Sequence, residues 1–275
     1  MSGILYLIAT PIGNLEDITY RAARILSEVS AIACEDTRQS HKLLEHLGIR
    51  KPLLSCHEHN ERARADEIAG RLVHGDSIAL ISDAGSPLVS DPGYRVVEAA
   101  LEAGMTVVPI PGPSALITAL MASGLATDAF YFGGFLPPKA TQRRKVLESL
   151  AELDATLIFY ESPHRILESL AEIADVLGER RTVVARELTK LHEEFVRGTA
   201  AEIAATLAGR PSVKGEITLL IAKADVQVED TTPIPESVAQ LLAAGVPRMD
   251  AMKAVARRRG VSKRDVYKAM EGFSS

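Results

Sequence analysis

The sequence predicts an α/β protein made of two α/β domains and a small helical segment at the carboxyl end. Short apolar runs alternate with segments whose apolar residues recur at helical spacing, which is typical of alternating strands and helices. Three of these runs end in loops rich in Gly and Pro, as the strands of a parallel sheet do at a binding site. Beyond residue 233 the patterns are all helical.

The first α/β series occupies the amino-terminal part of the chain. The expected strands are residues 4–9, 30–34, 77–82 and 106–110, and the expected helices are residues 19–29, 37–47, 60–74 and 93–104. Gly48, Gly75 and Gly104 follow the last three helices, at positions where glycine commonly ends a helix. The alternation predicts a mostly parallel sheet.

A second series follows the segment PGPSALITALMASG. Its expected strands are residues 129–133, 155–160, 182–187 and 216–222, and its expected helices are residues 140–151, 163–177 and 200–208. The chain should cross from one series to the other around residues 112–124. We therefore predict an amino-terminal domain over residues 1–116 and a carboxyl-terminal α/β domain over residues 117–225.

The carboxyl-terminal tail, residues 233–275, follows a polar, proline-bearing linker at 224–235. Its three helical patterns are separated by Gly245 and Gly260, and Ser262 with Asp265 resembles an N-cap arrangement. The tail holds eight Lys and Arg against four Asp and Glu, a balance of +4, so with a net charge of −5 the rest carries −9. A helix-turn-helix that docks on a nucleic acid fits this pattern. The alternative is a small helical bundle that packs on the body or on a second subunit.

The three Gly- and Pro-containing loops are the most informative feature of the chain. They read TPIGN from residue 10, SDAGSPLVSDPG from residue 82 and PGPSA from residue 111. None matches a dinucleotide-binding or P-loop pattern, and their prolines remove donors that a phosphate would need. Three loops in one domain suggest one shared ligand. Exposed carbonyls favour a neutral or cationic ligand, a description that S-adenosylmethionine fits.

Composition excludes several classes of protein. No apolar stretch reaches the ~18 residues of a membrane span, and no basic segment precedes the first strand, so we expect neither a transmembrane helix nor a signal peptide. Cys34 and Cys56 show no disulfide or zinc spacing, which predicts reduced thiols and a cytoplasmic protein. Cys56 to His59 lacks a further ligand set, so we expect no metal site.

Polar clusters follow several expected strands, where α/β sheets place their ligands. Glu35 and Arg38 come after one strand, Glu161 after a second and Arg186 after a third. A base that accepts a hydroxyl proton could come from such a cluster, although no general base can be named. The alternative for each is a helix cap or a surface ion pair, and Asp36 is a candidate cap.

Five ordered motifs resemble the ribosomal RNA small subunit methyltransferase I family, a branch of the tetrapyrrole-methylase superfamily. They are LYLIATPIGNLEDIT at 5–19, ACEDTR at 33–38, ISDAGSPLVSDPG at 81–93, PIPGPSA at 109–115 and FYESPHR at 159–165. The resemblance implies 2′-O-methylation of a cytidine in the decoding centre of 16S rRNA, with S-adenosylmethionine as methyl donor. It also implies two α/β domains with the cofactor in the cleft between them, a homodimer, and 16S rRNA or the small ribosomal subunit as partner.

The resemblance also suggests roles for individual residues. The expected catalytic or substrate-positioning residues are Glu35, Arg38, Glu161 and Arg186. The expected cofactor contacts are Pro11, Asp83, Ala84, Gly85, Ser86, Val89, Ser114, Ala115, Tyr160, Ala185 and Glu216. Superfamily relatives often read Gly-Asp-Pro where this chain reads Gly85-Ser86-Pro87, so either Asp83 or Ser86 takes that polar role. The expected RNA contacts are Arg257, Arg258, Arg259, Lys263 and Arg264.

Two other functions fit parts of the sequence. A corrinoid-precursor methylase of the same superfamily would have little use for a basic helical tail. A non-catalytic ribosome-binding relative would be expected to carry degraded cofactor loops, whereas all three loops are intact.

Overall fold

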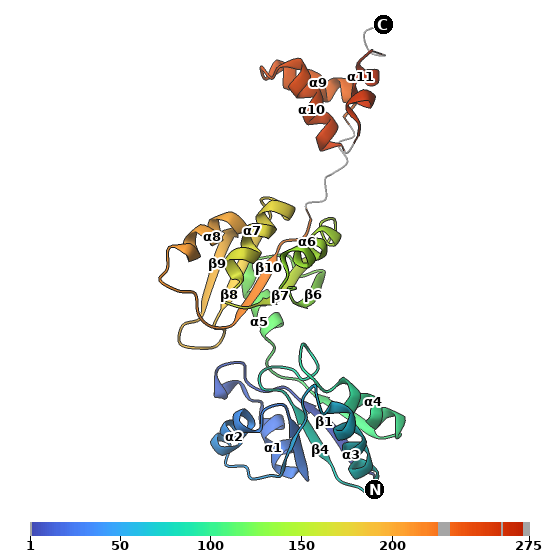
Figure 1. Cartoon of the computed structure of the whole chain (residues 1–275), viewed down its shortest axis with the longest axis vertical. Helices are drawn as coiled ribbons and strands as arrows, with labels where there is room; N and C mark the ends of the chain where they lie inside the picture. Colours follow the sequence, from blue (N-terminus) through green and yellow to red (C-terminus); the bar gives the residue numbers. More distant parts are fainter. Residues whose placement is uncertain (1, 225–231, 260, 272–275) are drawn as a thin grey trace. The chain divides into compact units, whose positions relative to one another are not determined.

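The computed structural model describes residues 2–224, 232–259 and 261–271 (Figure 1). The chain divides into two compact units, Met1–Ala224 and Asp225–Ser275. The first unit contains two five-stranded sheets, and the second contains three helices. The expected linker falls mostly on residues 225–231, which lie outside the described residues.

The first sheet is entirely parallel, as the alternation of strands and helices predicted. Its strands pair in the order β3-β2-β4-β1-β5. Their bounds are Ile4–Ile8 (β1), Ala31–Cys34 (β2), Leu53–Ser55 (β3), Ile78–Ile81 (β4) and Thr106–Ile110 (β5). Because all five strands run the same way, the loops that follow them gather at one edge of the sheet.

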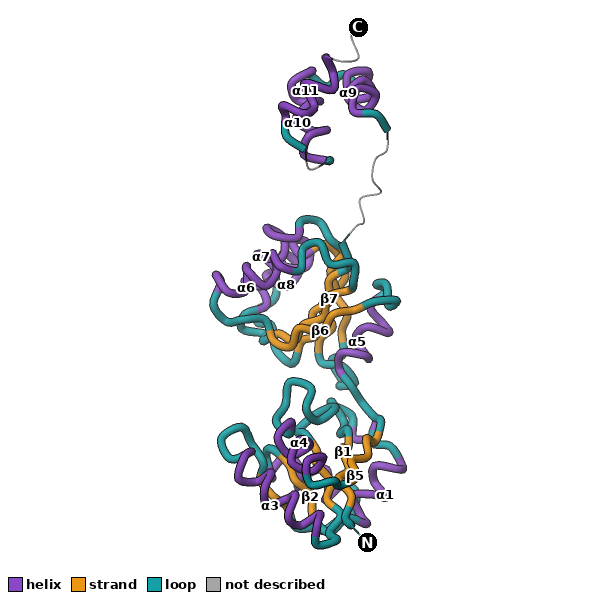
Figure 2. Tube along the Cα trace, turned by 90° about the vertical axis from the view of Figure 1, so that its right-hand side faces the viewer, coloured by secondary structure: helices purple, strands orange, loops and turns teal. Residues whose placement is uncertain are grey.

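Helices cover both faces of the first sheet (Figures 1 and 2). Alternate strand residues point to opposite faces, so Ile32 and Ile81 pack with α1 and α2, while Ala33 and Leu80 pack with α3 and α4. The helices are Tyr20–Glu28 (α1), Thr37–His46 (α2), Glu61–Val73 (α3) and Tyr94–Glu102 (α4), with a short 3-10 helix at Leu15–Asp17. The expected glycines lie just beyond the last residues of α2, α3 and α4, each with positive φ.

The second sheet is mixed, in the order β6-β7-β10-β8-β9. Its strands are Phe130–Phe135 (β6), Thr156–Glu161 (β7), Arg181–Arg186 (β8), Glu194–Thr199 (β9) and Ile217–Ile221 (β10). β10 is antiparallel to both neighbours, and Ile217 pairs with Glu161 on one side and Arg186 on the other. Therefore β7 and β8 end where β10 begins.

One face of this sheet packs against α6, α7 and α8, and the other packs against α5. These helices are Ala115–Ser123 (α5), Ala140–Ser149 (α6), Ile166–Leu177 (α7) and Ala200–Ala208 (α8). Two strands escaped the sequence-based expectation, β3 and β9. Both lie at sheet edges, where a strand buries less apolar surface and its hydrophobic pattern is correspondingly weak.

The carboxyl-terminal unit consists of Ile234–Ala243 (α9), Arg248–Arg258 (α10) and Lys263–Glu271 (α11), which matches the three expected helical patterns. Its small core contains Val238, Met252, Val255 and Val266. The predicted N-cap of α11 is confirmed, because the backbone N–H of Asp265 donates to Ser262 Oγ at 3.2 Å and the Ser262 hydroxyl donates to Asp265 Oδ2 at 2.6 Å.

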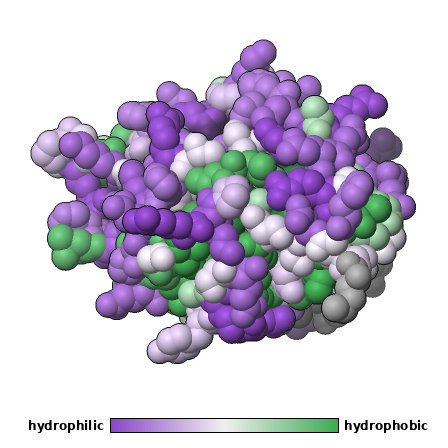
Figure 3. Space-filling model, turned by 90° about the horizontal axis from the view of Figure 1, so that it is seen from below, coloured by the Kyte–Doolittle hydropathy of each residue, from purple (hydrophilic) through white to green (hydrophobic). Residues whose placement is uncertain are grey.

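The surface is largely polar. Figure 3 shows one face on which hydrophilic residues predominate and hydrophobic residues form separate groups. Within the parts of the chain that the structure describes, no helix is long and apolar enough to cross a membrane.

Candidate active site

The three loops expected to share a ligand are bonded to one another. We call them the β1 loop (residues 9–14), the β4 loop (residues 82–93) and the β5 loop (residues 111–114). Thr10 and Gly85 form an isolated antiparallel bridge, with both N–H···O distances at 2.9 Å. The Ser86 hydroxyl donates to the carbonyl of Pro113 at 3.4 Å, which links the β4 loop to the β5 loop. The three loops therefore act as one structural element.

The second sheet supplies the opposite wall of the site. A bulge at Gly133–Gly134 shifts the register of β6 between Phe132 and Phe135. Phe135 then stands edge-on to Tyr160, with ring centroids 5.6 Å apart, and both residues line the site. A Cβ on Gly133 would lie 2.4 Å from Phe159 Cε1, so the close approach of β6 to β7 requires glycine.

A second contact joins the β1 loop to the loop after β8. The backbone N–H of Asn14 donates to Thr189 Oγ1 at 3.1 Å. A Cβ on Gly13 would lie 2.5 Å from Lys190 Cγ, so no larger residue fits there without displacement. The site is thus held together across segments about 175 residues apart in sequence.

These elements enclose a cavity of about 380 Å³, which is within the size range of small-molecule sites. The walls combine apolar side chains such as Ile12, Val89 and Leu188 with backbone groups of the β4 loop. Four carboxylic acids line the cavity, and among the described lining residues there is no Lys, Arg or His. Glu161 and Glu216 are paired with Arg165 and Lys190, so the unpaired negative charge of the cavity comes from Asp83 and Asp91. This charge favours a cationic ligand and disfavours a phosphate.

Most residues expected at the cofactor site line this cavity. Those that do are Asp83, Ala84, Gly85, Ser86, Val89, Ser114, Ala115, Tyr160 and Glu216. Pro11 and Ala185 do not: both are buried in the protein. Asp83 and Ser86, the two candidates for the polar role in the β4 loop, both line the cavity. The side chain of Asp83 also accepts a hydrogen bond from the Asp36 N–H at 3.1 Å.

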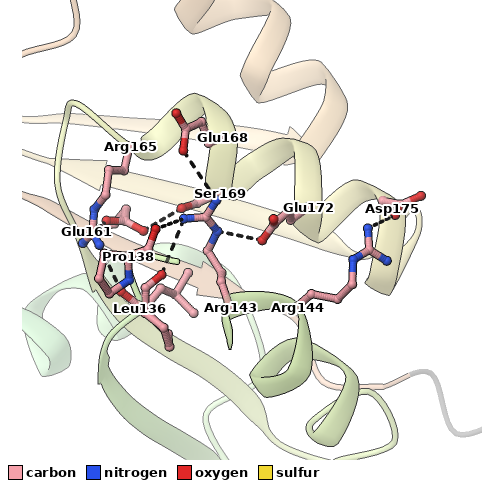
Figure 4. Close-up of polar contacts among 11 residues, drawn as sticks. Leu136, Pro138, Arg143, Arg144, Glu161, Arg165, Glu168, Ser169, Glu172 and Asp175 are labelled. Carbon is pink, nitrogen blue, oxygen red and sulfur yellow. Dashed lines mark hydrogen bonds and ion pairs between the residues drawn. The ribbon is translucent and has the colours of Figure 1, made fainter. Parts of the chain in front are cut away.

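Glu161 lines the cavity, but both of its carboxylate oxygens are engaged by the protein (Figure 4). Oε1 lies 2.7 Å from Arg165 Nη2 and accepts from the Ser162 N–H at 2.7 Å, while Oε2 accepts from the Ser169 hydroxyl at 2.6 Å. Arg165 also donates to the carbonyl of Leu136. This network ties the β7–α7 turn to the segment after β6, and so holds the wall that the second sheet supplies.

A buried arginine continues the network away from the cavity. Arg143 is 1% exposed and pairs with Glu172 at 2.7 Å and with Glu168 at 3.5 Å (Figure 4). Its guanidinium also lies 3.5 Å from the carbonyls of Pro137 and Pro138. It fastens α6 to α7 behind the site, which is a structural role.

Arg186 is also committed to contacts within the protein. It pairs with Glu194 at 3.2 Å and donates to the carbonyl of Lys214 at 3.0 Å. Arg210 binds the same carboxylate at 2.6 Å, and the two arginines, Arg210 foremost, lower the pKa of Glu194 to about 2. These contacts position the strands around the start of β10.

Glu35 and Arg38 differ in their surroundings. Arg38 folds back on Asp36, with Nη2 2.7 Å from Oδ2, and its side chain is 88% exposed. Asp36 accepts from the Arg38 N–H and so caps α2, as the alternative interpretation of this motif expected. Glu35 is half-buried, and burial together with the charge of Asp83 raises its pKa.

Sequence reasoning missed Asp91, which lines the cavity at the end of the β4 loop. Burial, followed by the charges of Glu35 and Asp83, raises the pKa of Asp91 to about 6. Two non-glycine residues of the same loop, Leu88 and Ser90, have φ of 71° and 65°. Backbone conformations of this kind are uncommon and concentrate at functional sites. The motif Ser-Asp-Pro-Gly at 90–93 was the available signal.

Phe135 was missed as well. The paired glycines before it were the signal, because glycine within a strand often marks a bulge. Cys56 to His59 form a turn after β3, and the rings of His57 and His59 lie 6.0 Å apart. No group of three or more His, Cys, Asp or Glu able to hold a metal occurs among residues 2–224, 232–259 and 261–271.

The expected RNA contacts lie in the carboxyl-terminal unit. Lys263 and Arg264 are exposed in the first turn of α11. Arg259 is half-buried and donates to Ser237 Oγ at 2.8 Å and to the carbonyl of Thr232, so it helps hold the unit together. The side chains of Arg257 and Arg258 lie outside the described part of the structure.

Comparisons with known proteins agree on one family. Residues 4–204 match the family model described as Tetrapyrrole (Corrin/Porphyrin) Methylases. The ribosomal RNA small subunit methyltransferase I of Halalkalibacterium halodurans is 48% identical over 272 residues, covering 96% of this chain and 93% of that protein. The protein of the same name from Pasteurella multocida is 47% identical, covering 100% of this chain and 99% of its own length.

Solved structures share the fold. A diphthine synthase aligns with a TM-score of 0.61 at 14% identity, covering 80% of this chain and 90% of the other. The uroporphyrin III C-methyltransferase of Thermus thermophilus aligns with a TM-score of 0.57 at 19% identity, covering 80% and 97%. At these identities the alignments show a common architecture and carry no information on substrate.

Proposed function

The chain belongs to the ribosomal RNA small subunit methyltransferase I family of the tetrapyrrole methylases, and on this basis we propose that it is an S-adenosylmethionine-dependent rRNA methyltransferase. We further propose that it methylates the ribose 2′-hydroxyl of a cytidine in the decoding centre of 16S rRNA. The cavity enclosed by the three loops and the second sheet is the proposed donor site.

The observation that carries this proposal is the charge of the cavity. Its lining includes four carboxylic acids, of which Asp83 and Asp91 form no ion pair, and no basic side chain occurs among the described lining residues. S-adenosylmethionine bears a sulfonium and an ammonium against one carboxylate, so it is a net cation that such a cavity accommodates. The apolar residues Ile12, Val89 and Leu188 and the rings of Phe135 and Tyr160 offer surfaces for its uncharged parts.

The residues present fit such a donor. Ser114 and Ala115 open α5 at the cavity, where the first backbone N–H groups of a helix favour a carboxylate. The β4 loop carbonyls and Asp83 suit an ammonium or ribose hydroxyls.

When bound, S-adenosylmethionine supplies a methyl group already activated by the sulfonium, so the protein has to provide mainly alignment. The bonded loops hold one wall, and the Glu161–Arg165–Ser169 network holds the other. Both walls are fixed before any ligand arrives, which lowers the entropic cost of aligning the acceptor hydroxyl.

We propose that the carboxyl-terminal unit docks on rRNA through the exposed Lys263 and Arg264 of α11. Phosphate contacts of this kind supply affinity and steer encounter, without acting on the methyl group. Deletion of residues 233–275 should leave donor affinity intact, raise the KM for the small subunit and flatten the salt dependence of binding. A stable truncated protein with an unaltered salt slope would refute this docking role, whereas loss of solubility or of oligomeric state would favour a packing role.

The central experiment has two steps. Calorimetry with S-adenosylmethionine measures donor binding, and mass mapping of 16S rRNA after incubation with small subunits locates the methylated nucleotide. Donor binding with a methyl group on a cytidine ribose is the expected result. Methylation of a corrinoid precursor, or the absence of any donor binding, would refute the proposal. We also expect a cytoplasmic homodimer, which light scattering on the purified protein and cell fractionation test.

A further inference from the structure

The carboxylate of Asp91 differs from the other acids of the cavity in having no partner. No hydrogen bond or ion pair to its carboxylate is formed by any of the residues that the structure describes. Glu161 has both oxygens engaged, Asp83 accepts from the Asp36 N–H, and Glu216 pairs with Lys190 at 3.1 Å. Asp91 is thus an available proton acceptor at the cavity wall.

The main chain around Asp91 is held firmly in place. Glu61 of α3 accepts hydrogen bonds from the N–H groups of Gly93 and Arg95, at 2.8 and 2.9 Å, and so anchors the end of the β4 loop. Ser90, directly before Asp91, has φ of 65° and also lines the cavity. The backbone that follows Asp91 is therefore anchored to α3.

Asp91 belongs to the β4 loop, and β4 stands between β1 and β2 in the sheet. This loop is therefore flanked by the β1 loop on one side and by the residues that follow β2 on the other. Glu35, which follows β2, is near enough for its charge to act on Asp91. The charge of Asp91 also acts on Tyr160 of the opposite wall. Asp91 therefore lines the cavity from the loop that is flanked by the residues following β2.

Resting on the proposed function, we propose that Asp91 is the catalytic residue that accepts the proton of the acceptor hydroxyl during methyl transfer. The hydroxyl oxygen forms a bond to the methyl carbon while the carbon–sulfur bond breaks and leaves its electron pair on sulfur. The O–H proton passes to the Asp91 carboxylate. The sulfonium becomes a neutral thioether, the ribose gains a methyl ether, and Asp91 returns its proton to water.

The charges around Asp91 suit this role. Two charged groups act on Asp91: Glu35, which follows β2, and Asp83, which belongs to the same loop. From β7, the group that interacts electrostatically with Asp91 is the phenol of Tyr160. Glu61 faces the backbone that follows, through its hydrogen bonds to Gly93 and Arg95. Burial and the two carboxylates raise the pKa of Asp91 to about 6. A base with a pKa near the working pH accepts a proton more effectively than an ordinary aspartate, and remains ionised at neutral pH.

The test compares Asp91→Asn with the parent and with the matched control Asp66→Asn, an exposed aspartate on α3. Single-turnover methyl transfer to small subunits measures the chemical step, and calorimetry measures affinity for S-adenosylmethionine. We expect Asp91→Asn to lower the single-turnover rate about 10²- to 10⁴-fold, as for loss of a general base. Donor affinity should fall far less, by about tenfold at most, because the variant also removes one of the two cavity carboxylates that form no ion pair. The control should match the parent.

The pH dependence provides a second readout that a structural role would not produce. The parent rate should rise with pH up to about 6 and then level off, because Asp91 must be ionised to accept the proton. Glu35→Gln removes a negative charge, lowers the pKa of Asp91 and should move this rise to lower pH. Asp91→Asn should lose the rise.

Separate outcomes refute the two proposals. If the parent binds donor but methylates no rRNA, the proposed function is wrong, and the role of Asp91 is wrong with it. If the parent is active and Asp91→Asn transfers methyl groups at the parent rate, the role of Asp91 alone is wrong. A loss of donor affinity in proportion to the loss of rate would also refute it, because it would make Asp91 a donor-binding residue.

Discussion

Replacing Glu161 by Gln tests whether the cavity wall depends on a buried ion pair. The Glu161 side chain is fully buried, and Arg165 is 24% exposed. The sequence and its family resemblance led us to expect a catalytic or substrate-positioning residue here, and replacing such a residue by alanine should leave the melting temperature near that of the parent. The observed contacts predict a different result: the variant should unfold more easily. Glutamine keeps a single acceptor oxygen and carries no charge, so it cannot accept from Arg165, Ser169 and the Ser162 N–H together, and Arg165 loses its counter-charge.

The size of the effect follows from these contacts. Breaking a fully buried ion pair by removing one partner costs about 3–5 kcal/mol, and the partial exposure of Arg165 places Glu161→Gln lower, at about 2–3 kcal/mol. For a folded unit of this size the melting temperature should fall by roughly 4–12 °C. Because Ser162 and Pro163 line the cavity, donor affinity should weaken as well.

Scanning calorimetry and urea unfolding of the full chain measure the change in stability. The matched control is Glu168→Gln, which removes a carboxylate that is 70% exposed and 3.5 Å from Arg143, and should cost less than about 0.5 kcal/mol. If Glu161→Gln melts within 1–2 °C of the parent, on the order of the control's shift, the ion pair does not support the wall. A large loss of turnover at unchanged stability would then restore the catalytic interpretation.

Three further predictions concern the cavity. Ala115→Phe should weaken S-adenosylmethionine binding at least about tenfold in calorimetry without unfolding the protein, because a ring would fill space at the cavity wall; unchanged affinity would contradict the proposed donor site. Gly133→Ala should lower the free energy of unfolding measured in urea by about 1–3 kcal/mol, because the new Cβ would lie 2.4 Å from a ring carbon of the buried Phe159. The control Gly209→Ala, whose Cβ meets nothing closer than 3.7 Å, should leave the stability unchanged. Asp91→Asn should raise the melting temperature at pH 8 and leave it unchanged at pH 4. The folded-state pKa of Asp91, about 6, lies above the ordinary 3.8, so ionisation of Asp91 destabilises the native state above pH 6 and not below pH 4. Allowing for the partial exposure of Asp91, the variant should gain about 1 kcal/mol of stability at pH 8. An equal change in melting temperature at both pH values would contradict this prediction.

The sequence located most of the loops that line the cavity, but not the contacts that decide what each polar residue does. The β4 and β5 loops could be assigned to a ligand site because Gly, Pro and Asp directly after an apolar run are local signals. In the β1 loop the prediction named Pro11 as a cofactor contact, whereas its neighbour Ile12 lines the cavity. Which of the two side chains points into the cavity depends on the bridge between Thr10 and Gly85, which joins loops far apart in the sequence. Glu161 could be located at a strand end, yet nothing local showed that Ser169, eight residues on, would occupy its carboxylate.

The sequence by itself indicated the strands and helices other than β3 and β9, the presence of an α/β body and a helical tail, and the three loops that line the cavity. Hydrophobic periodicity and turn residues act within a few positions of one another, so these features can be seen along the chain. The tertiary structure alone decided that β10 runs antiparallel between β7 and β8, that Phe135 turns toward Tyr160, and that Asp91 lines the cavity opposite them. Each of these depends on pairing between strands or loops far apart in the sequence. Such pairing is selected by the packing of the whole core and leaves no local signature.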